Sequence, residues 1–197
     1  MVSVGGRPYL ERVLASFTDR GLRDFVLLTG FKHDVIEEHF GDGSRFGARI
    51  AYSREAEPLG TGGALRDAAP LLGPRFLLTF GDVLRFFDYD RFVTQYPDFC
   101  LAVYPRFTSG NAAVEEGRVV RFDKRAPELP YVDAGFSIMT SRSLDLLPSR
   151  GACSFEELVY GTLAERGELA GEIVDHDFYD IGTPDELART RAALERS

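Results

Sequence analysis

A glycine-rich run at residues 57–65 is the segment whose residue types most directly indicate ligand binding. It reads Glu-Pro-Leu-Gly-Thr-Gly-Gly-Ala-Leu and lies between a strand-like and a helix-like stretch. Glycine has no Cβ, so a backbone rich in glycine can bring its N–H groups close to a ligand. A helix that begins directly behind the run would direct the positive end of its dipole at that ligand. The run therefore predicts a site for a polar or phosphorylated small molecule.

Two carboxylates far apart in the sequence, Asp82 and Asp180, share a local setting, because each follows an apolar segment. In an open α/β sheet the ligand site lies at the carboxyl ends of the strands. Carboxylates placed there are suitable ligands for Mg²⁺ that also contacts a phosphate. Taken singly, each is better explained as a turn or capping residue, whereas together they could hold one ion. Of the nearby acidic residues, Asp90 is interpreted as the cap of a helix beginning at Arg91.

A third polar group, Asp123-Lys124-Arg125, ends an expected strand. A lysine at this place could bind a phosphate as a mobile point charge, and a solvated basic turn is an equally good interpretation. The sequence contains no Walker P-loop, no GxGxxG fingerprint and no activated serine or cysteine nucleophile.

The elements that must position these residues alternate along the first half of the chain. Helical spacing is found over residues 9–17, 32–40 and 62–69, and strand-like stretches over 25–29, 48–53 and 76–80. The continuous apolar runs 25–29 and 76–80 are typical of strands buried on both faces. This alternation predicts a parallel sheet with helices on both faces.

The second half is more mixed and partly antiparallel, with expected strands at 99–104, 112–115, 119–123 and 132–139. Capping-box patterns at 154–157 and 183–186 predict helices that begin there. The first helix has no buried strand before it, although an α/β domain of this kind usually opens on one. Either the sheet lacks its first strand or the sequence begins inside a longer protein, so we expect a single, N-terminally truncated domain over residues 1–197.

Bulk properties exclude several classes of function. The 197 residues carry a formal net charge of −8, which argues against a broad surface for nucleic acid or an anionic membrane. No apolar run approaches the roughly 20 residues of a membrane span, and no signal peptide is recognisable. The two cysteines fit no metal or redox spacing. These features predict a cytoplasmic enzyme or binding protein for small molecules.

In this order, the motifs resemble the sugar-1-phosphate nucleotidyltransferases, with most similarity to the mannose-1-phosphate and heptose-1-phosphate guanylyltransferase branch. Besides the 57–65 run, the matching segments are 4–11, 30–32, 36–37, 40–41, 52–55, 81–82, 122–124, 133–135 and 179–184. The resemblance covers essentially the whole chain. It implies a Rossmann-like, GT-A-like α/β fold with a mixed, mainly parallel sheet, helices on both faces and the first strand missing.

The resemblance also implies a reaction in which a sugar 1-phosphate attacks the α-phosphorus of a nucleoside triphosphate, with Mg²⁺ bound and pyrophosphate leaving. Asp82, Lys124 and Asp180 match the family's catalytic residues, and Asp82 and Asp180 its metal ligands. The residues that would contact the nucleotide and the sugar are Glu57, Leu59, Gly60, Thr61, Gly62, Gly81, Asp123, Asp133 and Gly135. Asp123 would touch sugar hydroxyls, and Gly135 would leave room for the sugar ring. A homodimer is compatible with the resemblance, and the base and the sugar stay open.

Two departures from the family leave alternatives open. The family usually has asparagine at the position of Asp133, and a carboxylate cannot donate the hydrogen bonds of an amide. The family's loop of the type Gly-Gly-x-Gly-Thr-Arg-Leu, which wraps the triphosphate, is absent from this sequence. A catalytically impaired paralogue that binds a nucleotide-sugar or a partner subunit is therefore the second hypothesis. A glycosyltransferase is a weaker third, because the Asp-x-Asp spacing at residues 88–90 lies past the expected strand end.

Overall fold

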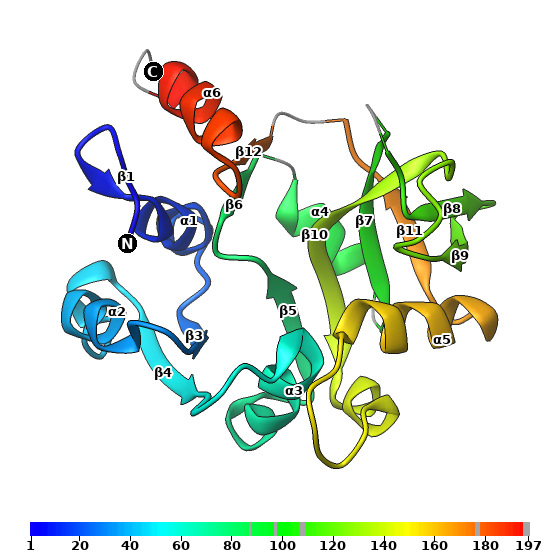
Figure 1. Ribbon diagram of the computed structural model, residues 1–197, viewed down its shortest axis with the longest axis horizontal. Helices are drawn as coiled ribbons and strands as arrows, with labels where there is room; N and C mark the ends of the chain where they lie inside the picture. Colours follow the sequence, from blue (N-terminus) through cyan, green and yellow to red (C-terminus); the bar gives the residue numbers. More distant parts are fainter. Residues whose placement is uncertain (87, 97, 107–108, 176–177, 195–197) are drawn as a thin grey trace.

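The central feature of the fold is a six-stranded mixed sheet (Figure 1). The computed structural model describes residues 1–86, 88–96, 98–106, 109–175 and 178–194. In spatial order the strands are β5 (Arg75–Thr79), β10 (Tyr131–Thr140), β7 (Cys100–Pro105), β11 (Ala170–Ile173), β9 (Arg118–Phe122) and β8 (Ala112–Glu115). β5, β7 and β11 run in one direction and β10 runs against β5 and β7. The expected α/β class and the antiparallel pairing in the second half are confirmed. The expectation of a mainly parallel sheet does not hold for this sheet, because β7 and β11 are its one parallel pair of neighbours among the described residues.

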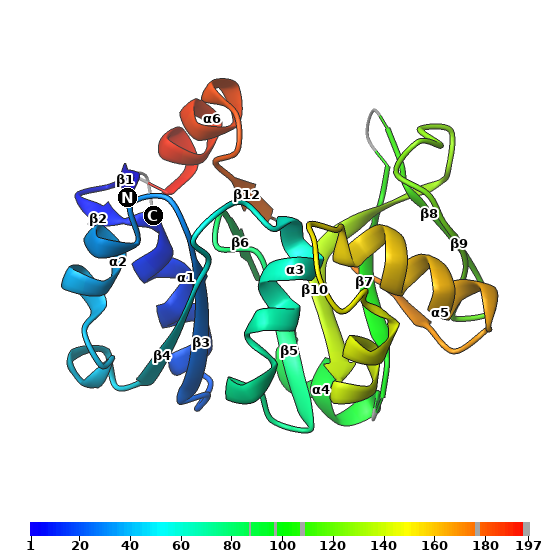
Figure 2. The same ribbon diagram turned by 60° about the horizontal axis from the view of Figure 1, so that its bottom comes forward.

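Three smaller pairs of strands accompany this sheet. β3 (Asp24–Thr29) lies parallel to β4 (Arg49–Arg54), and β6 (Val83–Arg85) lies antiparallel to β12 (Phe178–Asp180). At the N-terminus, β1 (Ser3–Val4) and β2 (Arg7–Pro8) form a short hairpin that the sequence analysis did not anticipate. Figure 2 shows β3 and β4 on one side of β5 and the rest of the large sheet on the other.

A large apolar cavity separates β3 from β5. Among the described residues β3 pairs only with β4, and β5 only with β10. The cavity has a volume of about 1750 Å³ and is lined by side chains of β3, β5, α1 (Tyr9–Thr18) and α3 (Gly60–Asp67). This is the arrangement expected of an α/β sheet that lacks one strand.

The prediction that residues 25–29 and 76–80 are buried on both faces is wrong. Leu28 is 36% exposed, and Phe76, Leu77 and Leu78 are half-buried. Among the residues that the structure describes, each strand has a neighbour on one edge only, and the cavity lies against both of them. The apolar runs were sound indicators of strands, but full burial also requires a neighbouring strand that is missing among the described residues.

Two of the α-helices begin at side-chain caps. α2 spans His33–Phe40, and α6 (Pro184–Leu194) begins at the predicted capping box, in which Glu186 N–H donates to Thr183 Oγ1 at 3.2 Å. The predicted cap at Asp90 is wrong: α4 spans Tyr89–Gln95, and Asp88 Oδ1 accepts the Arg91 N–H at 2.9 Å. Short 3₁₀ turns occupy Ser44–Phe46, Ala69–Leu71 and Ser141–Leu146. No helix of the described segments is long and apolar enough to cross a membrane.

The predicted helix after Ser154 forms in two parts. η4, a π-helical turn, spans Glu156–Tyr160, and α5 spans Gly161–Glu165. Ser154 Oγ accepts the Glu157 N–H at 3.3 Å, as the capping pattern predicted. The π-helical geometry was not predictable from the cap, and such turns are often found at functional sites.

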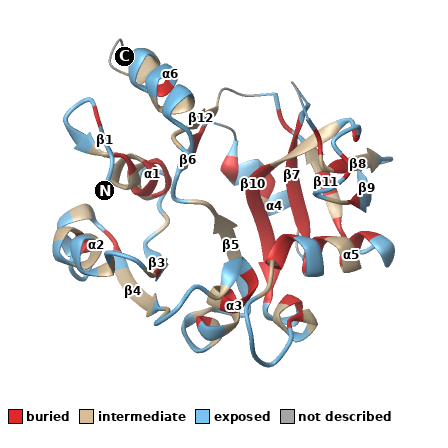
Figure 3. Ribbon diagram, in the orientation of Figure 1, coloured by how far each residue is buried: buried red, intermediate tan, exposed pale blue. Residues whose placement is uncertain are grey.

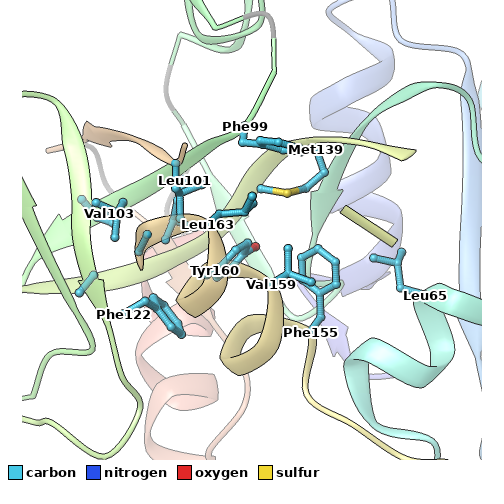
Figure 4. Close-up of a cluster of buried hydrophobic side chains, with 14 of the residues drawn as sticks. Leu65, Phe99, Leu101, Val103, Phe122, Met139, Phe155, Val159, Tyr160 and Leu163 are labelled. Atoms are coloured by element: carbon cyan, nitrogen blue, oxygen red, sulfur yellow. The ribbon is translucent and has the colours of Figure 1, made fainter. Parts of the chain in front are cut away.

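The second part of β10, residues 134–140, is buried throughout (Figure 3). Alternate side chains of a strand point to opposite faces, and Phe136 contacts the rings of Phe17, Tyr89 and Phe92 on one face. On the other face, Met139 joins the cluster shown in Figure 4, which includes side chains of η4 and α5. This packing holds the turn at residues 133–135, within β10, in a fixed position.

Candidate active site

The structure brings the two predicted metal ligands together. β6 begins directly after Asp82 and β12 ends at Asp180, and their antiparallel register places Asp180 opposite Val83. The Ile181 N–H donates to the Asp82 carbonyl at 3.1 Å. Both carboxylates border Gly182, where a Cβ would lie 3.0 Å from Asp180 Oδ1 and 3.9 Å from Asp82 Oδ2. Residues 98 positions apart in the sequence therefore share one site.

The electrostatics of this pair suit a bound cation. Burial raises the pKa of Asp180, and the charges of Glu186 and Asp82 add to the rise, while the Gly182 N–H and Arg85 oppose it. Within the described ranges, neither carboxylate forms an ion pair with a basic side chain. Nor do these ranges contain a group of three His, Cys, Asp or Glu residues that could hold a metal. Two carboxylates fit Mg²⁺, which takes its other ligands from water and phosphate.

A buried arginine that the sequence analysis missed lies next to this pair. Arg85 is 1% exposed. Its Nη1 donates to Thr79 Oγ1 at 2.9 Å, and its Nε donates to the Ala134 carbonyl. Its Nη2 has no partner among the described residues. Burial lowers the pKa of Arg85, and the charges of Tyr89, Asp133, Tyr104 and Asp82 oppose that effect. Nothing in the apolar stretch around it signalled a buried charge.

The turn at residues 133–135 follows on the other side of Arg85. Asp133 Oδ1 accepts the Gly135 N–H at 2.6 Å. Burial raises the pKa of Asp133 to about 6, against the opposing effects of that hydrogen bond and of Arg85 and Lys124. Gly135 has φ +62, and a Cβ there would collide with Arg85 Nη2 and the Phe80 ring. The space beside Gly135 on that side is thus filled by protein rather than open to a sugar ring.

The glycine run forms the beginning of α3 rather than a free loop, because the helix starts at Gly60. Gly60 has φ +68, and a Cβ there would lie 2.5 Å from the Cys153 carbonyl oxygen. The Gly62 N–H donates to that carbonyl, and the Cys153 N–H donates to the Leu59 carbonyl, each at 2.9 Å. The segment around Cys153 therefore holds the run in place, and the Gly62 N–H is not available to a ligand.

The remaining residues of the run have different surroundings. Gly60 and Thr61 line the large cavity. The Leu59 N–H donates to Glu55 Oε2 at 3.0 Å. Glu57 is exposed and does not line the cavity, and Gly81 does.

A second missed residue, Glu156, connects the glycine run with Lys124. Glu156 is 2% exposed. Its Oε2 accepts hydrogen bonds from Thr61 Oγ1 at 2.7 Å, Ser154 Oγ at 2.7 Å and Lys124 Nζ at 3.0 Å. Burial by itself would raise the pKa of Glu156, but these hydrogen bonds outweigh it and the pKa is lowered. The capping pattern assigned roles to Ser154 and Glu157 and none to Glu156. In the structure Glu156 is the first residue of the π-helical turn, and its side chain is buried.

The neighbouring side chains of Asp123 and Lys124 have different hydrogen-bond partners. Lys124 joins Glu156, whereas Asp123 Oδ1 accepts the Arg125 N–H at 2.9 Å and Oδ2 accepts from Arg121 Nη2 at 3.1 Å. These hydrogen bonds lower the pKa of Asp123. The Asp123 carboxylate is therefore engaged in its own turn.

Taken together, the site has a surplus of negative charge. It holds the carboxylates of Asp82, Asp133, Glu156 and Asp180 and the cations Arg85 and Lys124. A polyphosphate ligand would add more negative charge, which these two cations alone do not balance. A divalent cation at Asp82 and Asp180 would reduce that imbalance.

Comparison with known proteins agrees with this geometry. No protein-family model matches the chain. Over its full length it is 30% identical to the mannose-1-phosphate guanylyltransferase of Mycobacterium tuberculosis, of which it spans 58%. It is 27% identical to the D-glycero-alpha-D-manno-heptose 1-phosphate guanylyltransferase of Aneurinibacillus thermoaerophilus, with 99% of the chain and 88% of the relative covered.

Solved structures show the same fold. The crystal structure of HddC from Yersinia pseudotuberculosis matches with a TM-score of 0.83 at 22% identity, and the match covers 98% of this chain and 88% of HddC. A structure of HddC complexed with GMP-PN matches with a TM-score of 0.80 at 21% identity over the same shares of both chains. By its sequence relatives and its fold, the chain is similar to the sugar-1-phosphate nucleotidyltransferases.

Proposed function

We propose that this protein transfers a nucleotidyl group from a nucleoside triphosphate to a sugar 1-phosphate and releases pyrophosphate. The observation that carries the proposal is the meeting of Asp82 with Asp180, beside Arg85 and the 133–135 turn. The names of the relatives support the same reaction class.

In this reaction a phosphate oxygen of the sugar 1-phosphate forms a bond to the α-phosphorus. The bond from the α-phosphorus to the oxygen that bridges it to the β-phosphate breaks, and that oxygen leaves with pyrophosphate. Catalysis of this kind rests on positioning and on reducing charge repulsion. Lys124 would bind the sugar phosphate through its ammonium group and orient the attacking oxygen. Asp82 and Asp180 would hold Mg²⁺, which when bound neutralises charge on the phosphates.

The sugar would lie near Asp133. A carboxylate accepts hydrogen bonds and cannot donate them, so Asp133 would favour a sugar that presents hydroxyl donors. Because its pKa is raised to about 6, Asp133 would be ionised and able to accept at neutral pH.

The names of two relatives, both guanylyltransferases, favour GTP with mannose 1-phosphate or a heptose 1-phosphate as the substrates to propose. The complex of HddC with GMP-PN supports a guanine nucleotide. The test is a pyrophosphate-release assay with Mg²⁺, in which each of the common nucleoside triphosphates is paired with either sugar phosphate. Release that depends on both substrates supports the proposal, and release from the nucleotide alone would point to a hydrolase.

The alternative is a catalytically impaired protein that binds a nucleotide-sugar. The observation that favours it is the cavity of about 1750 Å³ between β3 and β5, beside Gly60 and Thr61. A site with an incomplete wall on its nucleotide side would bind product more readily than it would order a triphosphate. Calorimetric titration with GDP-mannose, set beside the release assay, distinguishes the two: a protein that binds GDP-mannose but releases no pyrophosphate from GTP and mannose 1-phosphate supports the alternative.

A further inference from the structure

Lysine is rare in this protein, and one of its few copies lies in the candidate site. Of 23 Lys and Arg residues only Lys32 and Lys124 are lysines. Lys32 is exposed and lies over the Phe31 ring at 5.4 Å. The Lys124 side chain is 42% exposed and contacts Glu156, whose side chain is 3% exposed. Lys124 thus has a buried carboxylate partner, and no such partner is described for Lys32. Lys32 can therefore serve as the internal reference when the reactivity of Lys124 is measured.

Glu156 gathers donors from three separate segments. Thr61 belongs to the glycine run on α3, Ser154 to the segment that holds this run, and Lys124 to the turn after β9. All three donate to Oε2, so the position of the lysine ammonium is tied to that of the Thr61 hydroxyl. Hydrogen bonds to an ionised group are stronger than neutral ones, and more so away from water.

The Lys124 ammonium keeps donors for a ligand in this arrangement. An ammonium has three N–H donors, of which Glu156 accepts one at 3.0 Å, while Ser154 Oγ lies at 3.5 Å. A phosphate oxygen can therefore bind Lys124 without displacing Glu156. A carboxylate that serves only as a helix cap would not need a contact with this lysine.

We propose that Glu156 is a positioning residue, which holds the Lys124 ammonium at a fixed place relative to Thr61 before a phosphate binds. The part of this inference that concerns the sugar phosphate rests on the proposed function. The part that concerns the free protein does not, because the contacts exist without a ligand.

The first test is acylation of the free protein with an N-hydroxysuccinimide ester, with Lys124 and Lys32 quantified by mass spectrometry. Glu156→Gln should raise the ratio of Lys124 to Lys32 labelling by about tenfold, the loss expected for one charge-assisted hydrogen bond. Ser154→Ala is the matched control, because it loosens the same segment but keeps the Glu156 carboxylate. Its ratio should stay within about twofold of the wild type. An unchanged ratio in folded Glu156→Gln protein would overturn the proposal.

Should Glu156→Gln fail to fold, Glu156→Asp takes its place, since a shorter carboxylate keeps the charge and withdraws from Lys124. It should give an intermediate ratio. In steady-state kinetics, either variant should raise KM for the sugar 1-phosphate by about tenfold and leave KM for the nucleotide nearly unchanged. A variant that merely unfolded would lower kcat and leave both KM values alone.

Ligand protection separates this inference from the proposed function. Mannose 1-phosphate should protect Lys124, but not Lys32, from acylation in the wild type. If Glu156→Gln releases Lys124 and mannose 1-phosphate or a heptose 1-phosphate gives no protection, the proposed function fails and the positioning role stands. If protection occurs but labelling does not depend on Glu156, the positioning role fails.

Discussion

β10 and β3 are both built from apolar residues, yet they are buried to very different extents. Ile138 of β10 is 0% exposed and Leu28 of β3 is 36% exposed. β10 has β5 on one edge and β7 on the other, whereas β3 pairs with β4 alone in the described part of the chain. Packed layers cover β10, and the apolar cavity borders β3. Composition therefore identifies a strand, while the neighbouring strands decide how much stability each of its side chains contributes.

The same contrast divides the candidate site. The 133–135 turn and Arg85 belong to the well-packed region and are fixed by hydrogen bonds, whereas Glu156 borders the cavity and is fixed by the donors of its Oε2. The glycine run faces the cavity and is fixed through the segment around Cys153. We therefore expect the sugar-phosphate side of the site to be rigid and the nucleotide side to depend on what occupies the cavity.

The largest expected difference between the two regions is the cost of truncating one apolar side chain. Ile138→Ala should reduce the free energy of unfolding by about 2–5 kcal/mol, because it leaves a cavity in a filled core. Leu28→Ala should cost less than about 1 kcal/mol, because its side chain already borders open space. Urea denaturation of both variants measures the difference. Equal losses would show that β3 is packed as tightly as β10.

A glycine substitution should give the next largest contrast. Gly135→Ala combines a positive φ with a collision against Arg85 and Phe80, so it should cost about 2–4 kcal/mol. Gly21 has a φ of +88, and nothing lies within 4 Å of a Cβ added there. Gly21→Ala should therefore lose only about 1 kcal/mol, the cost of a left-handed backbone conformation for alanine. Thermal unfolding of both variants is the measurement. A Gly135→Ala protein as stable as Gly21→Ala would mean that Arg85 and Phe80 move aside easily.

A pH series separates a buried carboxylate from an exposed one. The folded-state pKa of Asp133 is raised to about 6, so this residue lowers stability progressively as pH rises from the unfolded-state value toward 6. Asp133→Asn should therefore gain about 1–3 kcal/mol near neutral pH and nothing near pH 4.

Asp24 of β3 should behave in the opposite sense. Its hydrogen bonds with the Arg49 guanidinium lower the pKa of Asp24, so its stabilising effect is present above the unfolded-state pKa and fades as pH falls. Asp24→Asn should then be slightly less stable than the wild type at neutral pH and indistinguishable from it in acid. Melting temperatures of both variants across this range test the signs, and a gain for Asp24→Asn at neutral pH would contradict them.

The smallest expected effect concerns a single hydroxyl at the end of β3. Thr29 is 5% exposed, and its Oγ1 has no hydrogen-bond partner among the described residues. Thr29→Val removes this unpaired group at equal volume, so stability should rise by about 0.5–1 kcal/mol. A loss of stability in thermal unfolding would indicate that the hydroxyl is bonded in solution.

The positions of the strands could be predicted from the sequence, whereas the burial of their side chains could not. The apolar runs gave β3, β5, β7 and β10 to within one or two residues, because continuous hydrophobic stretches of that length have few other uses. Their burial could not be predicted, since it depends on partners distant in the sequence. The cap at Asp88 instead of Asp90 is an error of two residues, typical of helix boundaries.

The candidate site was predictable where it rests on motifs and not where it rests on packing. Asp82 and Asp180 were paired from their similar settings and from the order of the motifs, and the structure brings them together. Arg85 and Glu156 were missed, because a charged residue within an apolar or capping pattern gives no sign of burial. Only the fold reveals that these two side chains connect the segments of the site.

We propose that Asp82 and Asp180 form the metal-binding centre of a nucleotidyltransferase site. Pyrophosphate release by Asp82→Asn tests it most directly, with Asp88→Asn as the matched control, because asparagine caps a helix as well as aspartate does. We predict that Asp82→Asn loses at least about 100-fold in rate and that added Mg²⁺ restores little of it. Asp88→Asn should keep nearly full activity. Wild-type rates in Asp82→Asn at ordinary Mg²⁺ concentrations would contradict the claim.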